Sequence, residues 1–144
     1  MKASATTWIG HTLTALFSIF LLGASIAPKL LGMPVAEETM RQLGWPPGYA
    51  FGIGILELTC LVLYLIPRTN VLGAVLFMGL LGGAMATQIR AGSPLFSHVL
   101  FSVYLGLFMW GGLWLRDPAV RALFPFRHDR KGRADLSVSD GLTQ

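Results

Sequence analysis

The segment from Tyr49 to Ile66, YAFGIGILELTCLVLYLI, is a continuous apolar run with one carboxylate, Glu57, near its centre. At about 1.5 Å per residue, a helix of this length spans roughly 27 Å, close to the hydrocarbon thickness of a bilayer. The run therefore predicts a membrane-spanning helix. A charged glutamate at that depth costs on the order of 2.5 to 3.5 kcal/mol by insertion scales. We expect Glu57 to be paired with another side chain inside the protein or to be protonated.

Three further apolar runs have the length of a membrane span, at residues 8–31, 71–89 and 95–115. Charged residues make up only 12% of the chain, against about a quarter in soluble domains. The turns at 67–70 and 91–94 are so short that they join antiparallel neighbours. We therefore predict an all-α membrane protein, with four transmembrane helices in an antiparallel bundle over residues 1–126.

The basic residues gather at the ends of the spans, which points to a membrane rather than to nucleic acid. With the spans as drawn, the side of the N-terminus holds Lys2, Arg68, Arg116, Arg121, Arg127, Arg130, Lys131 and Arg133, and the other side holds Lys29, Arg41 and Arg90. The positive-inside rule then places both termini in the cytoplasm. Residues 127–144 are predicted to be a basic, disordered cytoplasmic tail that faces the anionic leaflet.

The first run also has features of a signal peptide, since Lys2 precedes it and Ser25-Ile26-Ala27 is like a small-residue cleavage site. We expect it to be retained. The run is longer than the apolar core of a signal peptide, and Pro28 would become the first residue of the cleaved product.

Polar side chains recur at helical spacing within the spans, and each set predicts a face that points into the bundle. In span one the set is His11, Thr14, Ser18, Leu22, Ser25 and Lys29; in span two it is Gly54, Glu57, Leu61 and Tyr64; in span three it is Leu80, Gly83, Thr87 and Arg90. Gly54 is small enough to let another helix approach near Glu57. Gly79 and Gly83 have the GxxxG spacing of close helix contacts.

Two short helices are predicted outside the spans. The first lies in the loop of residues 32–48, where Pro34 and two glutamates come early, Arg41 comes late and Gly44 follows. The second begins at Asp117-Pro118 and ends at Leu123.

Five side chains are candidates for a site in the outer half of the bundle. Counted from the outer boundary, Lys29, Gln88 and His98 lie within roughly 6 Å, Arg90 lies at the boundary, and Glu57 lies about 12 Å deep. In the functional interpretation a polar pocket opens here, Glu57 and His98 are catalytic and exchange a proton with a small amphipathic ligand, and Lys29, Gln88 and Arg90 bind that ligand.

Two alternatives stay open. In the first, Glu57 hydrogen-bonds His98 or Lys29 and simply locks the helices together. In the second, these residues never meet.

Several chemistries do not fit this sequence. Its His and Cys residues lack the spacing of a metal or haem site, and Cys60 has no second cysteine with which to form a disulfide within the chain. The sequence contains no phosphate-binding loop and no serine nucleophile elbow. If the protein takes part in redox chemistry, a bound quinone or a partner subunit must carry the electrons.

The combination of motifs resembles the DoxX-like family of small four-span bacterial membrane proteins. The resemblance covers roughly residues 8–126. It rests on Ala27-Pro28-Lys29-Leu30-Leu31-Gly32, Gly54-Ile55-Leu56-Glu57-Leu58, Tyr64-Leu65-Ile66-Pro67-Arg68, Leu81-Gly82-Gly83-Ala84 and Ser93-Pro94-Leu95-Phe96-Ser97-His98. It implies a four-helix bundle in the bacterial inner membrane, with the lysine, glutamate and histidine of the family at Lys29, Glu57 and His98.

The resemblance also implies an association with quinone-linked membrane oxidoreductases. Our leading hypothesis is a subunit, or a quinone-handling accessory, of such an enzyme, and the sequence leaves open whether the protein is itself an enzyme. The alternatives are a proton-coupled exporter of small hydrophobic compounds and a structural membrane anchor for a partner protein. The partners expected are the lipid bilayer, a quinone or another hydrophobic small molecule, and a redox partner protein or a second copy of the chain, with no nucleic acid.

Overall fold

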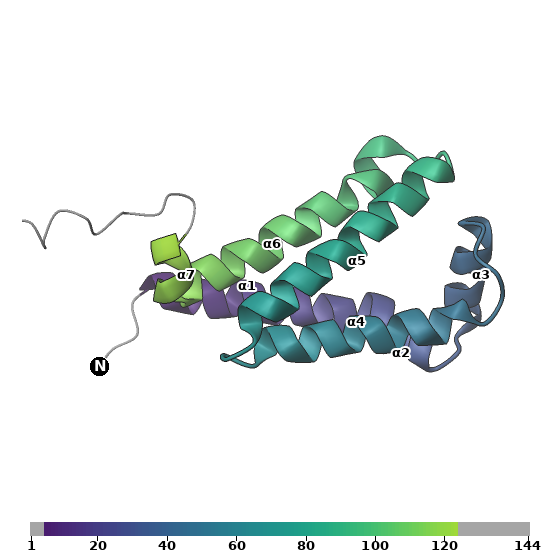
Figure 1. Ribbon diagram of the computed structural model, residues 1–144. Coiled ribbons are helices and arrows are strands. Elements are labelled where there is room, and N and C mark those ends of the chain that lie inside the picture. The colour runs from purple at the N-terminus through teal and green to yellow at the C-terminus, as the bar shows by residue number, and fades with distance from the viewer. Residues whose placement is uncertain (1–4, 124–144) are drawn as a thin grey trace, which may run out of the picture.

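The computed structural model describes residues 5–123, and every element in that range is a helix. The predicted tail at 127–144 lies outside the described residues. Four helical stretches run back and forth, the last two inclined to the first two, and a short helix lies across one end of them (Figure 1). The all-α prediction is confirmed.

The predicted spans correspond closely to the observed helices, since each predicted boundary lies within three residues of the observed one. The first span consists of α1 (Ala5–Leu21), η1 (Leu22–Ile26) and α2 (Ala27–Leu30); the second is α4 (Tyr49–Leu65); the third is α5 (Asn70–Arg90); the fourth consists of η2 (Leu95–Val99) and α6 (Phe101–Arg116). The first, third and fourth stretches are long and apolar enough to cross a membrane, and α4, with 17 residues, is shorter.

The core of the bundle is built from aromatic and aliphatic side chains of all four stretches. α1 packs mainly on α6, while α5 packs on both α4 and α6 (Figure 1). The ring of Phe17 makes edge contacts with Tyr64 and Phe77, with ring centroids 5.7 and 5.5 Å apart. Met109 and Leu113 complete the fully buried centre.

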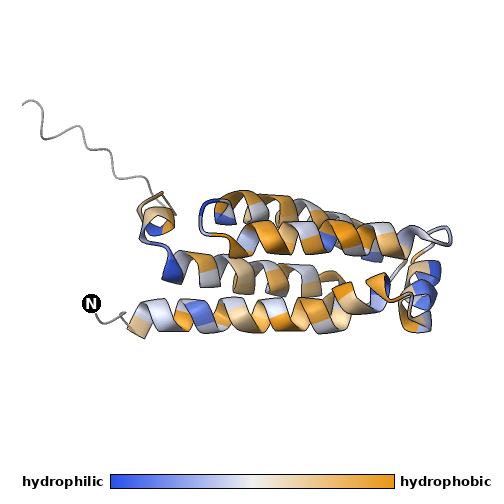
Figure 2. Ribbon diagram, turned by 90° about the horizontal axis from the view of Figure 1, so that it is seen from below, coloured by the Kyte–Doolittle hydropathy of each residue, from blue (hydrophilic) through white to orange (hydrophobic). Residues whose placement is uncertain are grey.

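The outward faces of the helices are apolar as well. Ile19 and Leu107, for example, are 68% and 67% exposed. Figure 2 shows the hydrophobic colouring running over the long helices, with hydrophilic residues concentrated in the turns and in the short helix across one end. Large exposed apolar surfaces of this kind are typical of helices in contact with lipid.

Two short helices close the ends of the bundle, as the sequence predicts. α3 (Pro34–Gln42) begins with its proline, buries Ala36 and Met40 against the bundle, and is followed by Gly44 at φ 78°. α7 (Pro118–Leu123) begins after Asp117, whose Oδ1 accepts the Ala119 amide at 2.9 Å. We refer to the two ends of the bundle as the α3 end and the α7 end.

The close helix contact of α5 occurs at a different glycine from the ones predicted. Gly79 and Gly83, which have the GxxxG spacing, are exposed, and a Cβ on either would meet nothing within 4 Å. They lie opposite Phe77 and Leu81, which face the core, so the predicted inner face of this span is wrong at Gly83 and at the exposed Arg90. The close helix contact occurs instead at Gly73, where a Cβ would lie 2.6 Å from the Tyr64 Cα.

Candidate functional site

A π-helical turn in the first span determines which of its side chains face α4. Buried positions follow ordinary helical spacing from Thr14 through Ser18 to Leu21, and the next buried residue, Ile26, comes five residues later. The extra residue of η1 accounts for this step, because a π turn has i→i+5 hydrogen bonds. Leu22, which the sequence pattern placed on the inner face, is therefore 40% exposed.

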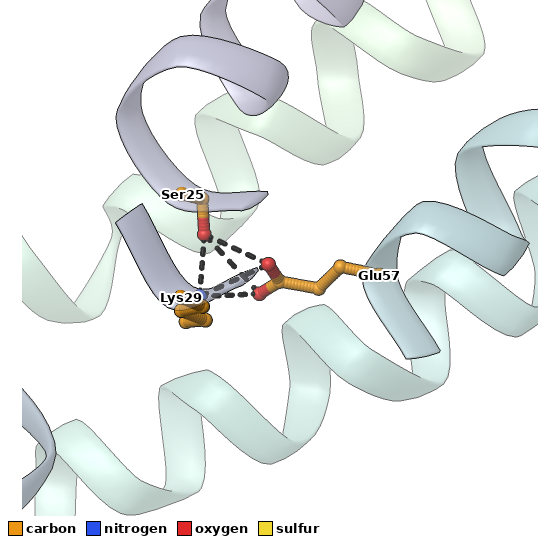
Figure 3. A network of polar contacts seen from close by, with 3 residues as sticks. All are labelled: Ser25, Lys29 and Glu57. Carbon is orange, nitrogen blue, oxygen red and sulfur yellow. Dashed lines mark hydrogen bonds and ion pairs between the residues drawn. The ribbon is translucent and has the colours of Figure 1, made fainter. Parts of the chain in front are cut away.

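Ser25 within this turn and Lys29 just after it lie on the side of the first span that meets Glu57 of α4 (Figure 3). The Lys29 Nζ donates to the two carboxylate oxygens of Glu57 at 2.8 and 3.0 Å. The same Nζ donates to the Ser25 Oγ at 2.6 Å. The Ser25 hydroxyl donates in turn to the Glu57 carboxylate, at 3.0 Å from its Oε2. These three side chains, which we call the Ser25–Lys29–Glu57 network, form a closed triangle.

The close approach of the two helices depends on Gly54, one turn before Glu57. A Cβ at Gly54 would lie 2.9 Å from the Cβ of Lys29. The ion pair is largely but not completely buried, since the side chains of Lys29 and Glu57 remain 15% and 14% exposed. The sequence predicted a partner for Glu57 and named Lys29 as one of two candidates, and the structure confirms that pairing.

The other predicted site residues have different neighbours. His98 is exposed on η2, with its Nδ1 2.8 Å from the Ser97 Oγ. The Arg90 Nη2 donates to the Leu43 carbonyl at 3.0 Å, and so ties the end of α5 to the loop after α3. The Gln88 Oε1 is buried and has no hydrogen-bond partner among residues 5–123. The roles assigned to these three residues in ligand binding and proton exchange stay predictions.

A second polar cluster lies at the α7 end, and helical spacing alone did not predict it. The Tyr64 hydroxyl donates to the Met109 carbonyl at 2.8 Å and lies 3.3 Å from the Thr14 Oγ1. The Arg116 guanidinium stands 4.9 Å from the centre of the Tyr64 ring and donates to the Tyr64 carbonyl at 2.9 Å. Thr14 and Tyr64 were each placed on inward faces, but Arg116 was counted only as a charge at the membrane surface.

Two surface hollows lie near the α3 end, and neither is lined by Lys29 or Glu57. The larger, of about 550 Å³, is bounded by α3 and the Trp45-Pro46-Pro47 turn. The smaller, of about 360 Å³, runs along the first two turns of α4 from Pro47 to Leu56. The three side chains of the Ser25–Lys29–Glu57 network contact one another directly, and a polar pocket around them stays a prediction.

The order and spacing of these elements can be compared with known protein families. A family model described as the DoxX-like family matches residues 12–112, which is well over half of the chain and includes Ser25, Lys29, Glu57 and His98. The chain belongs to the DoxX-like family. No curated protein and no solved structure matches it.

Membership in the DoxX-like family agrees with the fold, since three of the described helical stretches are apolar and long enough to span a membrane. The matched range begins in α1 and ends in α6, so it covers most of the helix bundle and contains the Ser25–Lys29–Glu57 network.

Proposed function

We propose that this DoxX-like protein is a subunit, or a quinone-handling accessory, of a membrane oxidoreductase in the bacterial inner membrane. The quinone head binds at the Ser25–Lys29–Glu57 network. The observation that carries the proposal is the ion pair itself, a lysine and a glutamate held 2.8 Å apart between apolar helices. A charge pair in such surroundings is expensive to desolvate, and ionisable residues within membrane helices mark functional sites as the default hypothesis.

The chemistry of the network suits a quinone. An ammonium group donates to a carbonyl oxygen, and a carboxylate beside it can take up a proton from water and pass it on. Reduction of a quinone to a quinol consumes two electrons and two protons. Glu57 and Lys29 serve the proton exchange, and a redox partner protein supplies the electrons.

Binding requires one rearrangement. Lys29 has three N–H donors, and the network already gives its Nζ three oxygen contacts. A quinone oxygen therefore replaces one of them, and the Ser25 hydroxyl, which is neutral, is the contact that costs least to give up. The partial exposure of both charged side chains leaves a route for this exchange.

The test is the binding of decylubiquinone to purified protein in detergent, measured by equilibrium dialysis. We expect Glu57→Gln to weaken binding at least about tenfold, because it removes the carboxylate that holds the Lys29 Nζ in position for the quinone oxygen. The matched control is Glu38→Gln, which removes a carboxylate that is also paired with a basic residue, Arg41, at 2.7 Å but lies on the exposed face of α3. Equal binding by the wild type and Glu57→Gln would refute the site.

A structural anchor is the second candidate, and the closed geometry of the network favours it. Ser25, Lys29 and Glu57 satisfy one another without any further group. On this account Glu57→Gln lowers thermal stability, quinone has no effect on either protein, and a partner protein co-purifies with both.

A further inference from the structure

The Ser25–Lys29–Glu57 network lies close to one end of the first helical stretch. α2 ends at Leu30, directly after Lys29, and the next residue, Leu31, is 75% exposed at the α3 end. The side chains of Lys29 and Glu57 are themselves partly exposed. A lysine this near the end of a membrane helix lies at the level where water and headgroups meet the protein. The exposed edge of the network is therefore reached from the α3 end.

Toward the α7 end, large apolar side chains fill the bundle next to the network. Leu61, one turn after Glu57 on α4, and Leu21, one turn before Ser25, are almost completely buried. Phe17 and Phe77, which are buried as well, meet edge to face with ring centroids 5.5 Å apart. We call these four side chains, Phe17, Leu21, Leu61 and Phe77, the apolar plug; all four belong to one buried cluster.

The polar groups at and beyond the plug are bonded among themselves. The Ser18 hydroxyl donates to the Thr14 carbonyl at 2.7 Å, and the Tyr64 hydroxyl donates to the Met109 carbonyl at 2.8 Å. Among residues 5–123, no hydrogen bond joins these hydroxyl groups to the Ser25–Lys29–Glu57 network. A proton moves between groups within hydrogen-bond reach, directly or through a water molecule. The plug therefore interrupts any proton path toward the α7 end.

The charged groups of the other helices are engaged elsewhere. On α5, Arg90 donates to the Leu43 carbonyl, and on α6, Arg116 donates to the Tyr64 carbonyl. His98 of η2 is exposed and lies beside Ser97. Within the described residues, Lys29 is the one basic side chain that forms an ion pair with Glu57.

We infer that water reaches the Ser25–Lys29–Glu57 network from the α3 end alone, and that Glu57 exchanges protons with that side of the membrane only. The plug seals the network from the α7 end. This water path exists whether or not a quinone binds. Its consequence for catalysis rests on the proposed function: the protons that a bound quinone takes up or gives off pass to and from the α3 side.

The test is cysteine labelling in a Cys60→Ser background with 2-sulfonatoethyl methanethiosulfonate, a small reagent that does not cross membranes. It is added to spheroplasts and, separately, to inverted membrane vesicles. Ser25→Cys probes the network, while Gln42→Cys and Ala122→Cys, both at exposed positions, mark the α3 end and the α7 end.

We expect Ser25→Cys to be labelled in the preparation that labels Gln42→Cys, and to stay unlabelled in the one that labels Ala122→Cys. The comparison does not depend on which end is cytoplasmic. Labelling of Ser25→Cys together with Ala122→Cys, or in neither preparation, would overturn the inference.

Ser18→Cys is the matched control, because it makes the same substitution in the same helical stretch at the level of the plug, where Ser18 is buried. We expect it to be protected in both preparations, and both variants to react fully after denaturation. Labelling of folded Ser18→Cys from either side would mean that the plug admits water. Decylubiquinone binding in detergent, where the protein has no separate sides, decides the proposed function independently.

Discussion

Lys29 and Glu57 hold each other in a part of the protein where an isolated charge is costly. Their separation of 2.8 Å and the added hydroxyl of Ser25 satisfy both groups. Loss of one partner leaves the other as an unpaired charge among apolar helices, whereas loss of both leaves no unpaired charge. The stability of the pair should therefore be strongly non-additive.

A double-mutant cycle measures this coupling. We expect Glu57→Gln and Lys29→Met each to lower the free energy of unfolding by about 2 kcal/mol, less than the 3 to 5 kcal/mol of a fully buried pair, because both side chains are partly exposed. The double variant should lose less than the sum of the two. Thermal unfolding in detergent gives the values, and simple additivity would mean that the pair contributes no coupling.

Asp117 makes a prediction about pH. Its Oδ2 accepts a hydrogen bond from Asn70 at 3.0 Å, and this bond, followed by the amides of Ala119 and Val120, lowers the pKa of Asp117 below its usual 3.8. A carboxylate whose pKa is lower in the folded protein stabilises the folded state at pH values above its ordinary pKa. This stability is lost as the pH falls through the pKa of the folded state.

We therefore expect the wild type to lose stability below about pH 3.8 through this carboxylate. Asp117→Asn keeps a capping side chain but cannot ionise, so its stability should depend less on pH in that range. Unfolding curves of both proteins at pH 7 and pH 3 make the comparison. Parallel losses in the two proteins would show that Asp117 is not responsible.

At the scale of helices, the contact between α4 and α5 depends on Gly73. A Cβ there would lie 2.6 Å from the Tyr64 Cα and 2.7 Å from the Leu63 carbonyl carbon, both backbone atoms that cannot move alone. We expect Gly73→Ala to destabilise the protein by about 3 kcal/mol, at the upper end for overpacking.

Gly79→Ala is the control in the same helix. Its Cβ would meet nothing within 4 Å, and alanine has the higher helix propensity, so we expect no loss and up to about 1 kcal/mol of gain. Both variants are compared by thermal unfolding. Equal stability of the two would mean that α4 and α5 do not pack as described.

Helix boundaries could be predicted because they follow from local properties. Apolar runs define the long helices, and Pro34, Gly44 and Asp117 mark the ends of the short ones. The π turn of η1 could not be predicted, since it exists to bring Ile26 into a core that other helices build.

In the candidate site, too, local spacing predicted some contacts, while others depend on packing against distant parts of the chain. Helical spacing and depth made Lys29 one of two candidate partners of Glu57, and the structure shows this pairing. His98 depends on the rotation of η2, and Arg116 on contacts with Tyr64 from a distant part of the chain. The local spacing of residues predicts neither the rotation of a helix nor a contact with a distant part of the chain.

At the scale of the whole protein, the bundle has two different ends, and their sides of the membrane are a prediction. The distribution of basic residues places the α7 end in the cytoplasm. Since Cys60 is the protein's one cysteine and is buried, Cys60→Ser gives a background for single-cysteine labelling.

In that background, Gln42→Cys probes the α3 end and Ala122→Cys probes the α7 end; both positions are exposed. With intact bacterial spheroplasts and a membrane-impermeant maleimide, we expect Gln42→Cys to be labelled at once and Ala122→Cys only after permeabilisation. The reverse pattern would invert the predicted topology.

We propose that the Ser25–Lys29–Glu57 network binds a quinone. The most direct measurement is native mass spectrometry of the protein released gently from its own membranes, with organic extraction of whatever is bound. We predict a stoichiometric quinone on the wild type and on Glu38→Gln that is absent from Glu57→Gln. A wild-type protein that carries no quinone but retains a second polypeptide would contradict the claim and establish the anchor instead.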